Sequence, residues 1–216
     1  METESTGTER GTERAEAFSD GVMAIAITLL ILEVKVPHPP GMEPIDLFNE
    51  LLRLWPSYFA LALSFVMIGI YWANHHYVFK LFTKTDHGLN LLNLSFLFWI
   101  TFLPFPTAVL GSYVLDGANQ TTAATFYSAG LLLPAVSWTL MWLYACFGRR
   151  LLDNRLESRF LRLLTVKYLG SVVVYAIAVL VSLTAFKLGL ALCVGLTLVY
   201  LAPPHFPMLG ATMQKY

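Results

Sequence analysis

Eight polar residues with useful chemistry lie near the ends of three long apolar segments of this sequence. They are Arg14, Ser19, Asp20, Trp72, His75, His76, Asn90 and Asn93. An ionisable side chain inside a membrane span is expensive and marks function by default. A buried carboxylate such as Asp20 needs a cation and hydrogen-bond donors, which Arg14 and the histidines supply. We therefore expect these side chains to form one bonded cluster.

Helical spacing supports such a cluster. At ~100° per residue, Asp86, Asn90 and Asn93 fall on one stripe of a helix. Trp72 lies three residues before His75 and four before His76, so it shares a helix face with both. The spacing therefore predicts that two helices turn these side chains toward a common point.

Three roles remain open for the cluster. Polar side chains lock membrane helices together, and histidines that titrate near neutral pH act as gates or pH sensors. A metal site is the weakest alternative, because the adjacent His75 and His76 point ~100° apart on a helix. The chain contains neither His-Glu-x-x-His nor Gly-x-Ser-x-Gly. We therefore expect no enzyme activity, no metal and no cofactor.

The composition identifies the elements that must position these residues. Of the 216 residues, 56% are hydrophobic and only 13% are charged, against about 25% charged in soluble domains. The mean hydropathy is +0.62. A net charge of zero argues against nucleic acid as a partner, and two cysteines argue against a disulfide scaffold. The chain is therefore expected to be a polytopic membrane protein.

Six segments are apolar over about the 20 residues that a spanning helix needs, although the last is short. They are residues 18–36, 54–79, 89–110, 123–147, 166–186 and 188–203. Continuous apolar runs favour helices over a barrel of alternating strands. We expect residues 1–13 to be a disordered cytosolic tail, 14–209 to form one six-helix transmembrane domain, and 210–216 to be a short tail. Residues 37–53 predict an external loop and an amphipathic interfacial helix.

The basic residues predict the orientation. If the N-terminus is inside, only Lys35, Arg53 and Lys187 of the 14 Lys and Arg residues lie outside. Both termini are therefore expected in the cytosol, with the protein in the cell (inner) membrane. The polar ends of the first three spans then lie at the same cytosolic depth.

The apolar body of the first span has two faces. With Ile25 at 0°, Thr28, Leu29 and Leu32 lie within about 60° of it. Asp20 lies about 140° away, on the side expected to face its own subunit. An apolar stripe on a membrane helix usually packs or faces lipid, yet apolar rings also close pores by dewetting. The stripe alone therefore does not identify a pore, and the chain has no Thr-Val-Gly-Tyr-Gly filter.

The first span also carries a recognisable motif. Residues 14–20 read Arg-x-x-x-Phe-Ser-Asp and are followed by Gly-Val-Met-Ala-Ile-Ala-Ile-Thr-Leu-Leu. This segment resembles the signature of the transmembrane protein 175 family of potassium channels, in the bacterial form with a single six-helix repeat. Residues 71–76 (Tyr-Trp-Ala-Asn-His-His) and 102–107 (Phe-Leu-Pro-Phe-Pro-Thr) fit as well. Met23 stands where many members have Phe.

The resemblance implies a homotetramer in which the first helix of each subunit lines a central pore. Carried onto this chain, it implies apolar constricting rings at Ile25, Leu29 and Leu32, with a pore-facing hydroxyl at Thr28. It also implies that the polar cluster faces the subunit interior. We therefore expect a potassium-permeable cation channel that conducts monovalent cations passively across the lipid bilayer, with potassium as the permeant ion.

Two other functions remain open. A proton-coupled secondary transporter would use Asp20 with His75 and His76 as its relay, although the chain shows no internal repeat of the kind many transporters have. A membrane scaffold without transport is the third alternative. Polar substitutions at Ile25 or Leu29 separate the channel from both.

Overall fold

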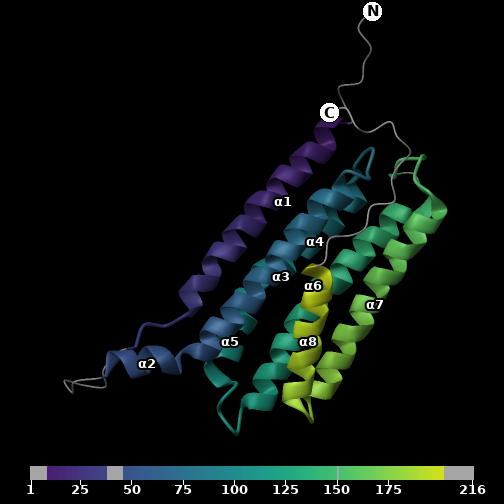
Figure 1. Ribbon diagram of the computed structural model, residues 1–216. Coiled ribbons are helices and arrows are strands. Elements are labelled where there is room, and N and C mark those ends of the chain that lie inside the picture. The colour runs from purple at the N-terminus through teal and green to yellow at the C-terminus, as the bar shows by residue number, and fades with distance from the viewer. Residues whose placement is uncertain (1–8, 38–45, 150, 202–216) are drawn as a thin grey trace, which may run out of the picture.

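Helices account for most of the described chain in the computed structural model, which covers residues 9–37, 46–149 and 151–201. Within these residues the structure contains no strand, apart from one isolated bridge between Phe82 and Leu152. The helices are α1 Glu9–Leu29, η1 Leu30–Glu33, α2 Leu47–Arg53, α3 Trp55–Phe79, α4 His87–Phe102, α5 Pro104–Tyr113, α6 Gln120–Cys146, η2 Phe147–Arg149, α7 Ser158–Ser182 and α8 Phe186–Leu201 (Figure 1).

Five helical segments are long and apolar enough to cross a membrane. They are Thr12–Glu33, Trp55–Phe79, His87–Tyr113, Gln120–Cys146 and Ser158–Ser182. The sixth expected span corresponds to α8, a shorter apolar helix of 16 residues. The chain is therefore an all-helical, multi-pass membrane protein, in agreement with the fold class expected from composition.

Several boundaries differ from the expected ones. Helix α1 already begins at Glu9, so residues 9–13 of the expected tail are helical, while residues 1–8 and 202–216 lie outside the described residues. The expected span 89–110 is two helices separated at Leu103. Pro104 explains the break, because proline has no N–H to continue a helix and is tolerated in a first turn.

Helix α6 lies at the centre of the bundle, where it contacts α4, α5, α7 and α8. Helix α1 lies at one edge and packs against α3 and α4 (Figure 1). Helix α2 is a short helix with no buried residue, as expected for an interfacial helix before the second span. Among the five long spans, the one that carries the candidate pore residues has the smallest buried share, 22%.

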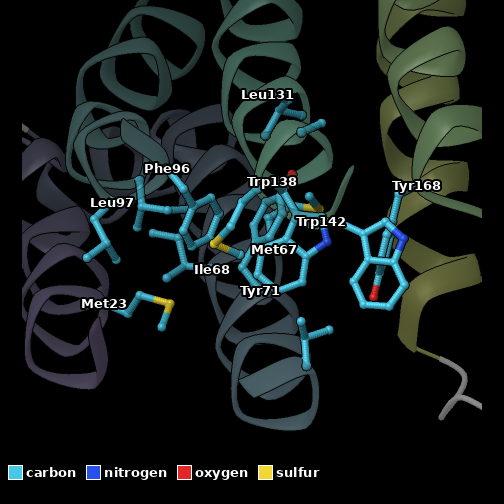
Figure 2. Packing of buried hydrophobic residues seen from close by; sticks show 14 of the residues in the cluster. Met23, Met67, Ile68, Tyr71, Phe96, Leu97, Leu131, Trp138, Trp142 and Tyr168 are labelled. Atoms are coloured by element: carbon cyan, nitrogen blue, oxygen red, sulfur yellow. The ribbon is translucent and has the colours of Figure 1, made fainter. Parts of the chain in front are cut away.

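Aromatic rings fill the centre of the bundle between α3, α4, α6 and α7 (Figure 2). Trp138 packs edge-to-face on Phe96 and Tyr168, with ring centroids 5.2 Å and 5.7 Å apart. Tyr71 packs in the same manner on Phe96 at 5.3 Å. Such pairs prefer edge-to-face geometry because the ring edge is positive and the face negative. The cluster holds α3 and α4 in register with α6.

A buried set of hydroxyls holds α5 in place. Ser64 Oγ on α3 lies 2.7 Å from Thr107 Oγ1 on α5 and 3.0 Å from the Tyr127 hydroxyl on α6. Thr107 also donates to the Leu103 carbonyl at 2.7 Å, next to the break between α4 and α5. These bonds satisfy polar groups that have no water to bond in a membrane.

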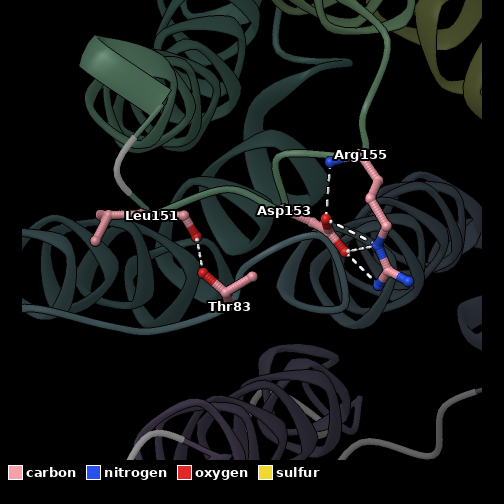
Figure 3. A network of polar contacts seen from close by, with 4 residues as sticks. All are labelled: Thr83, Leu151, Asp153 and Arg155. Atoms are coloured by element: carbon pink, nitrogen blue, oxygen red, sulfur yellow. Dashed lines mark hydrogen bonds and ion pairs between the residues drawn. The ribbon is translucent and has the colours of Figure 1, made fainter.

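Two loops at one end of the bundle are joined by backbone hydrogen bonds, a contact that we call the loop clasp. Figure 3 shows its side-chain part, in which the Thr83 hydroxyl donates to the Leu151 carbonyl at 3.4 Å and Arg155 bonds Asp153. The Thr83 amide donates to the Leu151 carbonyl at 2.9 Å, and the Asp153 amide donates to the Leu81 carbonyl at 3.1 Å. The Arg155 guanidinium donates to both Asp153 carboxylate oxygens, at 3.1 Å and 2.6 Å. These hydrogen bonds hold the pKa of Asp153 below its usual value. The clasp ties the α3–α4 turn to the segment between α6 and α7.

Gly189 allows α7 and α8 to approach closely. A Cβ atom there would lie 2.8 Å from the Ala178 carbonyl oxygen of α7 and would also overlap the Ser182 side chain. Gly189→Ala is therefore expected to destabilise the protein by about 1–3 kcal/mol through overpacking. The apparent melting temperature of the purified protein in detergent should fall by several degrees.

Gly195→Ala is the matched control on the same helix, because no atom lies within 4 Å of a Cβ at Gly195. Alanine is the better helix former, so this variant should melt at or slightly above the temperature of the unmodified protein. Equal melting temperatures for the two variants would contradict the close approach at Gly189.

Candidate functional site

Helix α1 and η1 present one buried and one exposed face. Ser19, Met23, Ala26 and Leu30 are buried, at a spacing of four, three and four residues. On the other face Ile25, Leu29 and Leu32 are 60%, 42% and 64% exposed, and Thr28 is exposed too. The four residues expected at a pore constriction therefore lie together on a face that its own subunit does not cover.

The Thr28 hydroxyl bonds back to its own helix. It donates toward the carbonyls of Ile25 at 2.9 Å and Ala24 at 3.1 Å. The hydroxyl proton is thereby occupied, and the oxygen lone pairs remain on the exposed face. Thr28 can therefore offer an acceptor on an otherwise apolar stripe.

Three of the expected polar residues form a continuous hydrogen-bonded chain, which we call the polar triad: Ser19, His75 and Asn93. Asn93 Nδ2 on α4 donates to Ser19 Oγ on α1 at 2.9 Å. Asn93 Oδ1 lies 3.0 Å from His75 Nε2 on α3. Because a carboxamide oxygen only accepts, His75 donates here from Nε2. All three side chains are buried, so the triad fastens α1 to both α3 and α4.

Aromatic rings enclose His75. Its imidazole stacks on Phe79 with ring centroids 4.0 Å apart and lies 6.1 Å from the Trp138 ring. The second ring nitrogen, Nδ1, is buried without a hydrogen-bond partner among the described residues. The histidine is therefore held on one side by the amide of Asn93 and elsewhere by apolar surface.

The other expected members lie outside the polar triad. Arg14, Trp72 and Asn90 are exposed in the subunit. Asp20 is partly buried, and its Oδ1 has no hydrogen-bond partner in the described part of the chain. That oxygen is buried within the subunit, although Asp20 lies ~100° around the helix from Ser19, at the edge of the buried face of α1.

His76 pairs with Glu16 of α1, a residue that was not among the expected members. The sequence signal for Glu16 was its charge, which lies at the same end of the first span as Arg14, Ser19 and Asp20. His75 and His76, although adjacent, therefore have different partners: one is bonded in the interior and the other forms an ion pair nearer the surface. The His76 contact joins α3 to α1 directly, whereas the His75 contact joins α3 to α4, which Asn93 in turn joins to Ser19 of α1.

No metal site accompanies these residues. Among the described residues, no three His, Cys, Asp or Glu side chains lie close enough together to hold a metal ion. The arrangement consists of one uncovered apolar helix face and one polar anchor at its end. An apolar helix face of this kind can line a path for ions.

Comparison with known proteins gives consistent matches. The family profile described as endosomal/lysosomal potassium channel TMEM175 matches residues 14–104. A potassium channel of Chamaesiphon minutus is 39% identical over 182 residues, which cover 84% of this chain and 89% of the relative. A chicken (Gallus gallus) relative named endosomal/lysosomal proton channel TMEM175 is 36% identical over 117 residues, covering 51% of this chain and 23% of the relative.

One solved structure matches over nearly the whole chain. It is the crystal structure of a lysosomal potassium-selective channel TMEM175 homologue from Chamaesiphon minutus, with a TM-score of 0.79 and 37% identity. The match covers 88% of this chain and 96% of that chain. The fold described above is therefore that of a solved channel structure.

The polar triad predicts a stability cost at Asn93. Asn93→Ala removes the bonds to Ser19 and His75 and leaves buried polar groups unpaired, so we expect a loss of about 1–3 kcal/mol. Thermal unfolding of the purified protein measures it. Thr101→Ala, at an exposed polar position on the same helix, should change stability by less than about 0.5 kcal/mol. A similar loss for both variants would argue against the triad.

Proposed function

The chain belongs to the TMEM175 family, and on this premise we propose that it is a potassium-permeable channel that conducts cations passively. One observation carries the proposal furthest: Ile25, Leu29 and Leu32 form an apolar stripe along α1 and η1 that the subunit leaves exposed. Two relatives that match this chain over most of their own length are named potassium channels, which supports potassium as the permeant ion. No enzymatic step or cofactor enters this proposal.

The proposed assembly is a homotetramer with α1 of each subunit at the central axis. Four copies of the exposed stripe would then face one another and form rings at Ile25, Leu29 and Leu32, with Thr28 beside them. Between Asp20 and Glu33 the segment carries no charged residue. Rings of this kind control ions by width and by dewetting rather than by charge. They offer no ligand set that distinguishes potassium from sodium, so the choice of potassium rests on the relatives.

The polar residues are proposed to position the pore helix. The polar triad and the His76–Glu16 pair fasten the N-terminal half of α1 to α3 and α4. Arg14, Asp20, Trp72 and Asn90 lie toward the same end and are proposed to complete the network when subunits assemble. In this role the cluster holds the helix ends in register and biases the pore between open and closed states.

The proposed topology has six spans in a bacterial inner membrane. Helix α8 is the sixth span, and both termini lie on the cytosolic side. Residues 14–209 would form the channel domain, flanked by short tails at 1–13 and 210–216. The distribution of Lys and Arg supports this orientation, because the loop clasp end of the bundle carries Lys80, Lys84, Arg155 and Arg159.

A proton-coupled function is the second candidate. It is favoured by Asp20 Oδ1 and His75 Nδ1, two buried atoms without a hydrogen-bond partner among the described residues. Ionisable groups of this kind form proton relays in transporters. A transporter of this class would saturate, run far more slowly than a channel and require a proton gradient.

Leu29→Asn tests the pore proposal. A polar ring hydrates the constriction, so potassium flux into liposomes should rise by roughly tenfold, equivalent to about 1.4 kcal/mol in the barrier, and the preference over sodium should fall. Fluxes are measured under a potassium gradient and then a sodium gradient with the purified protein.

The protein mass of the purified assembly in detergent should be four times the subunit mass of 24.2 kDa.

Ile177→Asn on α7 is the matched control, because Ile177 is 44% exposed and Leu29 is 42% exposed. This variant should keep the flux of the unmodified protein. If Leu29→Asn and Ile177→Asn behave alike, α1 does not form the constriction. Slow, saturable flux that needs a proton gradient would favour the transporter.

Cysteine labelling tests the orientation. Asn49→Cys on α2 should react with a membrane-impermeant maleimide in intact cells, whereas Lys84→Cys in the α3–α4 turn should react only after permeabilisation. The unmodified protein, whose Cys193 is buried and Cys146 partly buried, gives the background. The opposite labelling pattern would invert the proposed topology.

A further inference from the structure

We propose that the first turns of α7 bind the headgroup of an anionic phospholipid through Arg159, Arg162 and Lys167, which we call the basic arc. The site lies at the loop clasp end of the bundle, where α7 begins shortly after Asp153. The inference concerns the outer surface of one membrane-embedded subunit. It is therefore independent of the proposed channel function.

Helix α7 extends beyond the described end of α8, at the edge of the bundle opposite α1 (Figure 1). The two helices are antiparallel, because Gly189 near the start of α8 approaches Ala178 and Tyr200 near its end bonds Ser171. The described part of α8 ends one residue after Tyr200, whereas α7 continues for about 20 Å from Ser171 to its first residue, Ser158. The described part of α8 therefore leaves the first turns of α7 uncovered.

The basic arc lies on the outward face of these turns. On a helical wheel with Arg159 at 0°, Arg162 lies at about −60° and Lys167 at about +80°. Leu163 and Val166 lie between them and are 61% and 62% exposed. One surface therefore combines three cations with uncovered apolar side chains, a pattern that suits an amphiphilic anion.

No carboxylate neutralises the basic arc within the described part of the chain. The neighbouring Arg155 differs, because Asp153 already binds its guanidinium. Glu157 precedes the arc in the sequence, but it is exposed and forms no ion pair with any described residue. A phosphate group supplies the missing negative charge, and each arginine can bind it through two parallel N–H donors.

Lys167 is the least comfortable of the three cations. It is the tenth residue of the span Ser158–Ser182 and is half-buried. Its ammonium lies 4.2 Å from the centre of the Tyr200 ring, a contact that positions the charge without neutralising it. A charge within a span is costly unless it is paired or reaches the interface. Because a lysine side chain can extend toward the interface, an anionic headgroup there supplies a partner.

The apolar surface beside the basic arc favours a lipid over a free phosphate ion. Below Leu163 and Val166 the outward face continues through Gly170, where no atom lies within 4 Å of a Cβ position, to the exposed Val173. In a bilayer this face is covered by acyl chains, so the groups that reach the basic arc are the headgroups of the same lipids. Anionic headgroups attract basic segments at the membrane surface.

Native mass spectrometry of the purified protein with added lipids tests the site. Phosphatidylglycerol should stay bound under conditions that remove phosphatidylcholine. Arg159→Gln/Arg162→Gln should weaken phosphatidylglycerol binding by roughly tenfold, because two of the three cations are lost. Both arginines are exposed, so this double variant should fold normally. Lys167→Gln should weaken the same binding.

Lys80→Gln/Lys84→Gln is the matched control, because it removes two exposed positive charges from the same end of the bundle. It should retain phosphatidylglycerol as the unmodified protein does. An equal loss of binding in the two double variants would reveal general attraction to positive surface charge and overturn the proposal. Equal retention of phosphatidylcholine and phosphatidylglycerol by the unmodified protein would overturn it as well.

Inorganic phosphate separates the lipid from a soluble anion. At constant ionic strength, replacing chloride by phosphate should leave the phosphatidylglycerol bound, because the free ion makes no contact with the apolar face. Displacement of the lipid by phosphate alone would assign the basic arc to a soluble anion and overturn the lipid site.

Discussion

The attachment of α1 depends on hydrogen bonds that a membrane makes obligatory. Helix α1 contacts the bundle along one face only, and in that face Ser19 is the polar residue that enters the core. Because Ser19, Asn93 and His75 are buried within the subunit, they must satisfy one another. The bonds therefore determine which way the helix is turned. Once Ser19 points toward α4, Ile25 and Leu29 necessarily point away from the subunit.

Apolar content made the spans easy to predict, whereas the facing of individual side chains was harder. Hydropathy located α3 and α6 to within a few residues, and the wheel grouped Ile25, Leu29 and Leu32. The helical wheel could not decide whether Ser19 or Asp20 bonds within the core, because adjacent residues differ by ~100° and both are polar. The contact with Asn93 of α4 determines that Ser19 does so. The split between His75 and His76 has the same origin.

Other features carry almost no sequence signal. The loop clasp is built from backbone amides and carbonyls, which every residue except proline possesses. The break at Leu103 lies inside one apolar run, so hydropathy joins α4 and α5 although Pro104 marks the boundary. A small cavity between α3, α6, α7 and α8 arises where their side chains fail to fill space completely, and no local pattern records such a gap. These features belong to the packed bundle rather than to any one segment.

The loop clasp also constrains the order of events during biosynthesis. Thr83 and Leu151 are 68 residues apart, so their contact cannot form until the ribosome has synthesised everything through α6. The first four apolar segments are therefore synthesised before the turn between α3 and α4 can be fastened. If the spans are inserted one after another, the hairpin of α3 and α4 is inserted without the loop clasp. The clasp then forms when the segment after α6 emerges from the ribosome.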